Sequence, residues 1–214
     1  MKPRCSNQRS QALTIIEVVV VLFILAIFAT ILLPAILNGH GNRHGARISC
    51  VNNLKQLGLA YRIWEGDNGG KYPMNTSMRN GGFMETIAIF QTLSNELSTP
   101  KILFCPADAE RTAAPSFQSG FSAKNISYFV GLDASERFPQ ALLSGDDNFE
   151  IGGVPVKSGL LEISSKTPIA WSAARHKFSG NLLLADGSVQ SSSNSGLTNW
   201  IHQIGSATNR LAIP

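Results

Sequence analysis

The chain has 214 residues, of which 43% are hydrophobic and 15% charged, and its formal net charge is +4. Three of its 18 Lys and Arg lie in the first nine residues and one of its 14 Asp and Glu is Glu17, which leaves 15 minus 13, or +2, for the rest. That remainder has no Lys/Arg-rich run and no basic patch with interleaved aromatic residues, so no nucleic-acid partner is expected.

Residues 13–33 form an apolar run with one acid, Glu17, near its start. As a helix, 21 residues would extend about 31 Å, close to the ~30 Å hydrocarbon core of a bilayer. The basic segment 1–12 would stay in the cytoplasm. The run is longer than the roughly 7–15 apolar residues of a secretory signal. The sequence therefore predicts a cytoplasmic leader at 1–12, a transmembrane and assembly helix at 13–33, and a single-pass inner-membrane location with an extracytoplasmic, periplasmic C-terminal domain.

Glu17 has two interpretations. A carboxylate one turn into a membrane helix can reach the headgroups by itself. Alternatively, cleavage after Ala12 would free an amine at Leu13, and an ammonium there could pair with Glu17 of a neighbouring subunit and set the register between packed helices. Composition does not choose between the two.

After the apolar run, residues 34–66 are expected to continue the helix, with a break at the glycine-rich segment 38–45. Helical periodicity resumes at Ala46, and Asp67-Asn68-Gly69-Gly70 ends it. One apolar face follows from the spacing: Val51, Leu54, Leu57 or Gly58, Tyr61 and Trp64.

Residues 67–214 are predicted to form an exported globular domain. We expect a helix at 85–97, strands at 127–132, 160–163 and 169–172, a loop at 144–159, and a short closing helix at 197–204. Asp186-Gly187 between two apolar-rich runs predicts a hairpin with a type I′ turn. The expected fold class is α+β, with a long N-terminal hydrophobic helix packed against a small antiparallel sheet.

Three cysteines are present, and Cys5 falls in the leader. Cys50 and Cys105 would both be exported, and an even pair in an oxidising compartment favours one disulfide. Two buried free thiols are the alternative, and the sequence leaves both open.

The segment Ala12-Leu13-Thr14-Ile15-Ile16-Glu17 resembles the processing site of type IV pilins and type II secretion pseudopilins. In that family a small residue precedes the cut, an apolar residue follows it, and Glu is fifth in the mature chain. Pro34 matches a helix-kinking proline of the family. The resemblance implies that a prepilin peptidase removes residues 1–12 and methylates the amine of Leu13.

Further segments are similar to prepilin-type proteins. Cys50-Val51-Asn52-Asn53-Leu54, Asp67–Pro73 and Phe104–Asp108 match parts of a large prepilin-like family. His176, nine further residues and then Asp186-Gly187 match its members with a C-terminal H-x9-DG motif. Ala12 in place of Gly, Leu13 in place of Phe, and the glycine-rich 38–45 depart from the family pattern.

His176 and Asp186 are the best polar pair in the sequence. They could serve as metal ligands or an acid–base pair, whereas the structural interpretation makes Asp186 a turn residue and His176 a loop-capping residue. Asp146, Asp147 and Glu150 offer the oxygen ligands that calcium takes, but a solvated acidic loop is the default. His40 and His44 lack a third ligand in view. No catalytic residue, metal site or cofactor is expected.

The resemblance implies a structural subunit of a type II secretion pseudopilus or a related type IV pilus-like assembly, and not an enzyme. Its partners would be the prepilin peptidase, other pilin-like subunits, the inner-membrane secretion or assembly platform, and the membrane. The alternative is a membrane-tethered periplasmic binding module or enzyme that uses His176 and Asp186.

Overall fold

The computed structural model describes residues 14–37, 41–76, 85–204 and 208–214. Within these ranges, the side chains of residues 31–37 and 41–44 are not described. The chain divides into two compact units, Met1–Asn42 and Arg43–Pro214. Each unit is described separately below.

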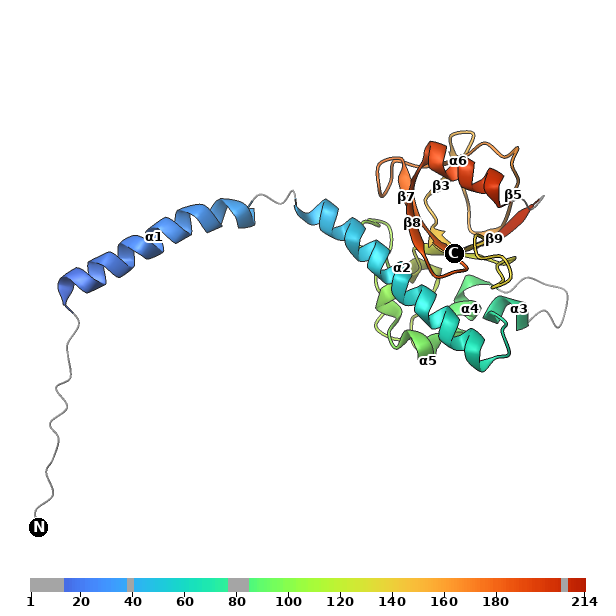
Figure 1. Ribbon diagram of the computed structural model, residues 1–214, viewed down its shortest axis with the longest axis horizontal. Helices are drawn as coiled ribbons and strands as arrows, with labels where there is room; N and C mark the ends of the chain where they lie inside the picture. Colours follow the sequence, from blue (N-terminus) through green and yellow to red (C-terminus); the bar gives the residue numbers. More distant parts are fainter. Residues whose placement is uncertain (1–13, 38–40, 77–84, 205–207) are drawn as a thin grey trace, which may run out of the picture. The chain divides into compact units, whose positions relative to one another are not determined.

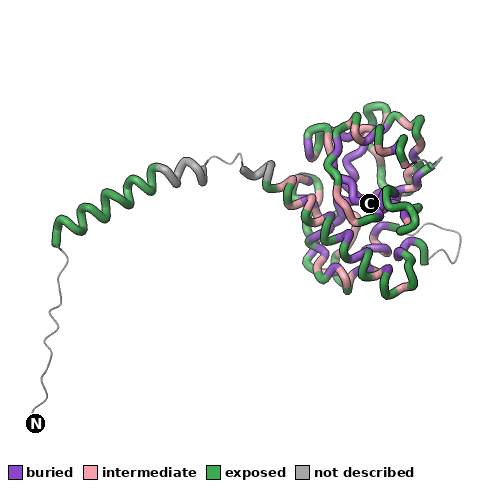
Figure 2. Tube along the Cα trace, in the orientation of Figure 1, coloured by how far each residue is buried: buried purple, intermediate pink, exposed green. Residues whose placement is uncertain are grey.

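In the first unit, helix α1 extends from Ile15 to Leu37. Its first turn is held by a capping arrangement between Thr14 and Glu17: the backbone N–H and the hydroxyl of Thr14 both donate to Glu17 Oε2, at 2.7 and 2.8 Å. These two hydrogen bonds stabilise the ionised carboxylate and hold the pKa of Glu17 below its ordinary value. The described side chains of this unit, residues 14–30, are all exposed (Figure 2).

The prediction of a long N-terminal hydrophobic helix packed against the sheet is wrong. Over the described part of the chain, no helix has both the length and the apolar character that a bilayer crossing requires. The predictions of a transmembrane helix at 13–33 and of a single-pass inner-membrane location are therefore corrected.

The second unit is α+β, with one six-stranded and one three-stranded antiparallel sheet (Figure 1). The large sheet has the order β5-β9-β1-β2-β7-β8 and the small one β4-β3-β6. The helices are α2 (Gly41–Asp67), α3 (Pro73–Thr76), α4 (Thr86–Thr92), α5 (Ser94–Leu97), α6 (Asn194–Gln203) and the 3-10 turns η1 (Pro100–Leu103) and η2 (Ala123–Asn125). The strands are β1 (Tyr128–Gly131), β2 (Leu142–Asp146), β3 (Phe149–Ile151), β4 (Val154–Pro155), β5 (Gly159–Ile163), β6 (Ile169–Trp171), β7 (Ser179–Leu184), β8 (Val189–Ser193) and β9 (Asn209–Ile213).

Helix α2 packs the face that its periodicity predicts. Leu54, Leu57 and Tyr61 are fully buried, and Gly58 lies so close to Leu183 of β7 that an added Cβ would be 2.8 Å from its Cδ1. The helix begins at Gly41, before the predicted restart at Ala46, and its described length includes part of the glycine-rich segment. Residues 41–45 are therefore helical and not part of a break. The rest of the predicted break, residues 38–40, lies outside the described residues.

Both faces of the large sheet are covered, which is why its central strands are buried along their length without alternation. Alternate residues of β1 show the two layers: Tyr128 and Val130 belong to the core beneath α2, whereas Phe129 belongs to a second core. That second core contains Leu197 and Ile201 of α6 and residues of the small sheet, and α2 and α6 lie on opposite sides of β7 and β8 (Figure 1).

The region 144–159 is not the predicted loop, since it contains the end of β2 and all of β3 and β4. Its Gly, Asp and Ser content hid the strands, because Ser144, Gly145 and Asp146 are buried between neighbours and not exposed at a turn. Strand β9, close to the C-terminus, was also not predicted, although it pairs with both β1 and β5.

The predicted hairpin at Asp186-Gly187 is present as β7–β8, but its turn is not type I′. Gly187 has a φ of 83°, whereas Asp186 is not among the residues with positive φ. The N–H of Gly187 donates to the carbonyl of Leu184 at 2.9 Å. This is the three-residue hairpin loop in which a type I turn is followed by a left-handed glycine.

Gly131 at the end of β1 is required by close backbone approach. A Cβ at this position would lie 1.8 Å from the carbonyl oxygen of Leu142 on β2. We expect Gly131→Ala to lower the free energy of unfolding by about 2 kcal/mol, because β1 and β2 would have to separate. Urea unfolding measures the loss. Gly66→Ala in α2 is the matched control, since its Cβ meets nothing within 4 Å, and it should be neutral or slightly stabilising.

Candidate functional site

Four segments that are distant in sequence meet in one buried polar cluster. They are α2, the loop that follows η1, the connection between β2 and β3, and the loop between β6 and β7. Each supplies buried side chains with charged, sulfur or imidazole groups. We call these residues the buried cluster: Cys50, Cys105, Asp108, Asp146, Asp147 and His176, which are buried, with Arg111 and Arg175, whose side chains are 19% and 8% exposed.

The sulfur part of the buried cluster is a disulfide between Cys50 of α2 and Cys105, whose Cα atoms are 5.1 Å apart. Both residues are fully buried. The bond ties α2 to the loop after η1 and closes a long loop, with a sequence separation of 55. In the chain-entropy model, a loop of this length contributes about 4 kcal/mol.

His176 lies against this disulfide, with its Nε2 atom 3.6 Å from Cys105 Sγ. The same Nε2 is 3.4 Å from Oδ2 of Asp146. Burial of the ring, followed by the charges of Arg47 and Arg175, lowers the pKa of His176 to about 4. The imidazole is therefore neutral at pH 7 and forms no ion pair with Asp146.

A strained backbone holds His176 in this position. The next two residues, Lys177 and Phe178, have φ values of 53° and 58°, in the left-handed region that non-glycine residues rarely adopt. The hydroxyl of Ser179 donates to the carbonyl of His176 at 2.5 Å, which closes the loop. Such strain persists only where surrounding contacts over-determine the conformation.

Asp146 ends β2 and is completely buried. Its Oδ2 accepts hydrogen bonds from the backbone N–H and the side-chain amide of Asn181, both at 2.8 Å, whereas its Oδ1 has no hydrogen-bond partner. Desolvation dominates over these bonds and over the nearby Arg175, and it raises the pKa of Asp146 to about 6. Asp146 thus keeps one buried acceptor oxygen with unused lone pairs.

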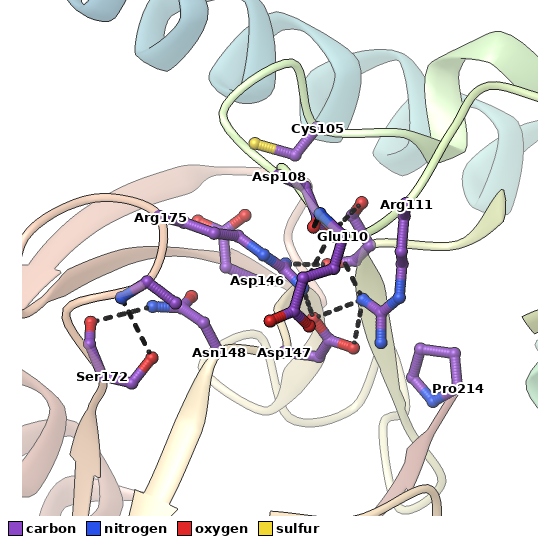
Figure 3. A network of polar contacts seen from close by, with 12 residues as sticks. Cys105, Asp108, Glu110, Arg111, Asp146, Asp147, Asn148, Ser172, Arg175 and Pro214 are labelled. Carbon is purple, nitrogen blue, oxygen red and sulfur yellow. Dashed lines mark hydrogen bonds and ion pairs between the residues drawn. The ribbon is translucent and has the colours of Figure 1, made fainter. Parts of the chain in front are cut away.

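The remaining members of the buried cluster form an ion-pair network (Figure 3). Arg175 Nη2 lies 2.9 Å from Asp108 Oδ2 and also pairs with Asp147 Oδ1. Arg111 Nη1 contacts Asp147 Oδ2 at 2.6 Å and Asp108 Oδ2 at 3.5 Å. Arg175 Nη1 further donates to the carbonyl of Ser127 at 2.7 Å. Two guanidinium groups therefore balance two carboxylates, and Asp146 is the additional acid.

The predicted pair of His176 and Asp186 does not form one site. His176 precedes β7 and Asp186 follows it, so the two lie at opposite ends of a six-residue strand, about 20 Å long at ~3.3 Å per residue. Asp186 is a turn residue whose Oδ1 accepts from the N–H of Ser188 at 2.8 Å. Gly187 provides the left-handed position of the same turn.

The three acids considered as calcium ligands, Asp146, Asp147 and Glu150, have different surroundings and different partners. Asp147 is buried and paired with Arg111 and Arg175, so its oxygens already face cations. Asp146 is bonded to Asn181, and Glu150 lies on β3, where it is half-buried. The region 146–150 is not the solvated acidic loop that its composition indicated.

The predicted processing residues Ala12 and Leu13 lie outside the described residues. Pro34 is in α1, in the part whose side chains are not described. Glu17 lies within the described residues, and its carboxylate accepts a hydrogen bond from the hydroxyl of Thr14. Sequence reasoning missed Asp108, Arg111 and Arg175, whose spacing carries no local pattern.

No family model matches the chain, and neither curated proteins nor solved structures give a significantly similar protein.

Proposed function

We propose that the chain is a structural subunit of a pilin-like filament, of the type II secretion pseudopilus or type IV pilus class, and that it assembles through α1. The observation that carries the proposal is the exposure of α1. Large apolar side chains such as Ile15, Phe23 and Leu22 are 84%, 68% and 59% exposed. Apolar surface of this extent is a mark of an interaction site.

Between Ile15 and Phe28, α1 exposes large apolar side chains on every side of the helix. A helix that is apolar on every side is stable only when it is surrounded. Copies of α1 can bury one another, because a bundle of identical helices covers each helix on several sides. A head-to-tail contact of this kind that does not close into a ring gives a helical filament.

Glu17 is the one charged residue in the described part of α1. The Thr14 contacts explain how it begins the helix, but they leave its charge exposed. Inside a bundle of apolar helices that charge needs a cation. The proposed processing after Ala12 would provide one, the amine of Leu13, on a neighbouring subunit. Glu17 would then both cap its own helix and set the register between copies.

Replacing Glu17 with glutamine separates these two roles. Glutamine can still accept the hydrogen bonds of Thr14 at the third helical position, so α1 should form as before. Without the charge, we expect the yield of sedimentable filaments to fall at least tenfold. The full chain would be produced with a prepilin peptidase, the mature N-terminus determined by mass spectrometry, and filaments measured by sedimentation and electron microscopy.

Thr14→Ala is the matched control, since it removes the hydroxyl of the cap but keeps the charge of Glu17. It should assemble nearly as well as the unaltered chain. Filaments of Glu17→Gln in normal yield, or a chain that keeps Met1 and does not self-associate, would contradict the proposal.

The alternative, a binding module or enzyme that uses His176 and Asp186, is not favoured. Its two residues lie at opposite ends of β7, so they cannot act on one ligand atom. The proposed function is assembly, and the second unit would be the part that each subunit displays.

A further inference from the structure

A second property, separate from assembly, follows from the sulfur and imidazole atoms of the buried cluster. The Sγ atoms of Cys50 and Cys105 and a ring nitrogen of His176 all lie within 4.8 Å of one another. All three residues are buried. Two cysteines and one histidine are a donor set that zinc takes in proteins.

We propose that Cys50, Cys105 and His176 bind one Zn²⁺ when the disulfide is reduced, and that the carboxylate of Asp146, whose Oδ2 lies 3.4 Å from His176 Nε2, shifts toward the sulfur atoms to complete the site. Disulfide and metal are then alternative states of the same buried site. Either state joins α2 to the loop after η1, and the metal state also includes the loop before β7.

The distances around His176 fit a tetrahedral zinc site. With Zn–S near 2.3 Å, Zn–N near 2.05 Å and Zn–O near 2.1 Å, the ligand atoms should be about 3.6 Å apart for N and S and about 3.4 Å apart for N and O. The structure has 3.6 Å between His176 Nε2 and Cys105 Sγ, and 3.4 Å between Nε2 and Asp146 Oδ2. The edge between His176 and Cys105 is therefore already in place, and Asp146 has the right spacing from His176 but lies outside the group of ligand atoms that are within 4.8 Å of one another.

Asp146 is the carboxylate next to His176, and its own hydrogen bonds leave one oxygen without a partner. It is completely buried, yet Oδ1 has no hydrogen-bond partner. A buried carboxylate oxygen without a partner is costly. A cation bound at Oδ2 would offset the charge of the whole carboxylate, including Oδ1. The Asn181 bonds to Oδ2 would orient the carboxylate, as outer partners of metal ligands commonly do.

The change between the two states balances. Reduction breaks the Sγ–Sγ bond with two electrons and two protons from a dithiol, which itself closes to a disulfide. Zn²⁺ then replaces the two thiol protons, which are released to solvent. Two thiolates and the Asp146 carboxylate leave the loaded site with one net negative charge, and Arg47 and Arg175 are the cations whose charges act on His176.

The test compares oxidised and reduced forms of the full chain in a Cys5→Ser background, so that only Cys50 and Cys105 can supply thiolates. The reduced chain is refolded with Zn²⁺, dialysed and assayed for bound metal, and Co²⁺ is used in parallel to show thiolate coordination by its absorption. We expect about one Zn²⁺ per reduced chain, a higher Tm with metal than without, and no bound zinc in the oxidised chain.

Substitutions identify the ligands. His176→Ala should weaken zinc binding at least tenfold, and Asp146→Asn should weaken it to a smaller extent. His202→Ala, at an exposed position of α6, and the double change His40→Ala with His44→Ala should leave it unchanged. Because His176→Ala could also disturb folding, the oxidised unaltered chain serves as the second comparison. Zinc bound equally by oxidised and reduced chains, retained in His176→Ala, or absent from the reduced chain would overturn the proposal.

Discussion

Replacing Arg175 with methionine is expected to lower the free energy of unfolding by about 4 kcal/mol. The side chain of Arg175 is 8% exposed, and it contacts Asp108 and Asp147, whose side chains are 3% and 2% exposed. Removing one partner from a buried ion pair leaves an uncompensated charge, which costs about 3–5 kcal/mol. Methionine keeps the volume of the aliphatic chain, so the loss measures charge and hydrogen bonding more than cavity formation. Urea unfolding at pH 7 measures it.

Arg210→Met is the matched control. Arg210 also pairs with an aspartate, Asp133, but these side chains are 40% and 34% exposed. Exposed pairs contribute at most about 1 kcal/mol. A loss of similar size in both variants would contradict the role assigned to burial. A second comparison adds Asp147→Asn to Arg175→Met, and the double variant should recover part of the stability, because the orphaned charge is removed together with its partner.

The second large effect concerns pH and the contact between His176 and Asp146. The folded chain lowers the pKa of His176 from 6.5 to about 4, so between these values the unfolded chain binds more protons at this residue. The contribution of His176 to stability is therefore complete above pH 6.5 and is lost as the pH falls to about 4. A shift of this size corresponds to about 3 kcal/mol.

Asp146 acts in the opposite direction. Its pKa is raised from 3.8 to about 6, so the folded chain binds more protons at this residue, and its contribution falls as the pH rises from about 4 to 6. The two contributions nearly cancel in the unaltered chain. Single substitutions should expose each of them, which makes the pair a sensitive test of the geometry.

We expect His176→Gln to gain about 3 kcal/mol relative to the unaltered chain when the pH is lowered from 7 to 4. Asp146→Asn should lose a similar amount over the same range. Unfolding by urea at several pH values, with the disulfide intact, measures both differences. Parallel pH profiles for the three chains would show that His176 and Asp146 do not titrate as a buried, desolvated pair.

Several parts of the fold could be predicted from the sequence because their signals are local. The apolar face of α2 follows from its periodicity, and the hairpin β7–β8 follows from Asp186-Gly187 between apolar runs. Its turn type was wrong because only Gly187, and not Asp186, takes positive φ. Strands β2 and β3 were missed because their small and acidic residues match a loop in composition, and only burial between two layers makes them strands.

The sequence alone determined the apolar face of α2, the β7–β8 hairpin and the presence of the two cysteines Cys50 and Cys105 after residue 12. Tertiary structure decided which polar residues meet. His176 was singled out with Asp186 because the two share a sequence motif, yet folding places it against Cys105 and Asp146, from other segments. Periodicity and turn chemistry act over a few residues and can be found in the sequence. The partners of a buried charge are instead set by the packing of segments that are far apart in the sequence, which no local pattern encodes.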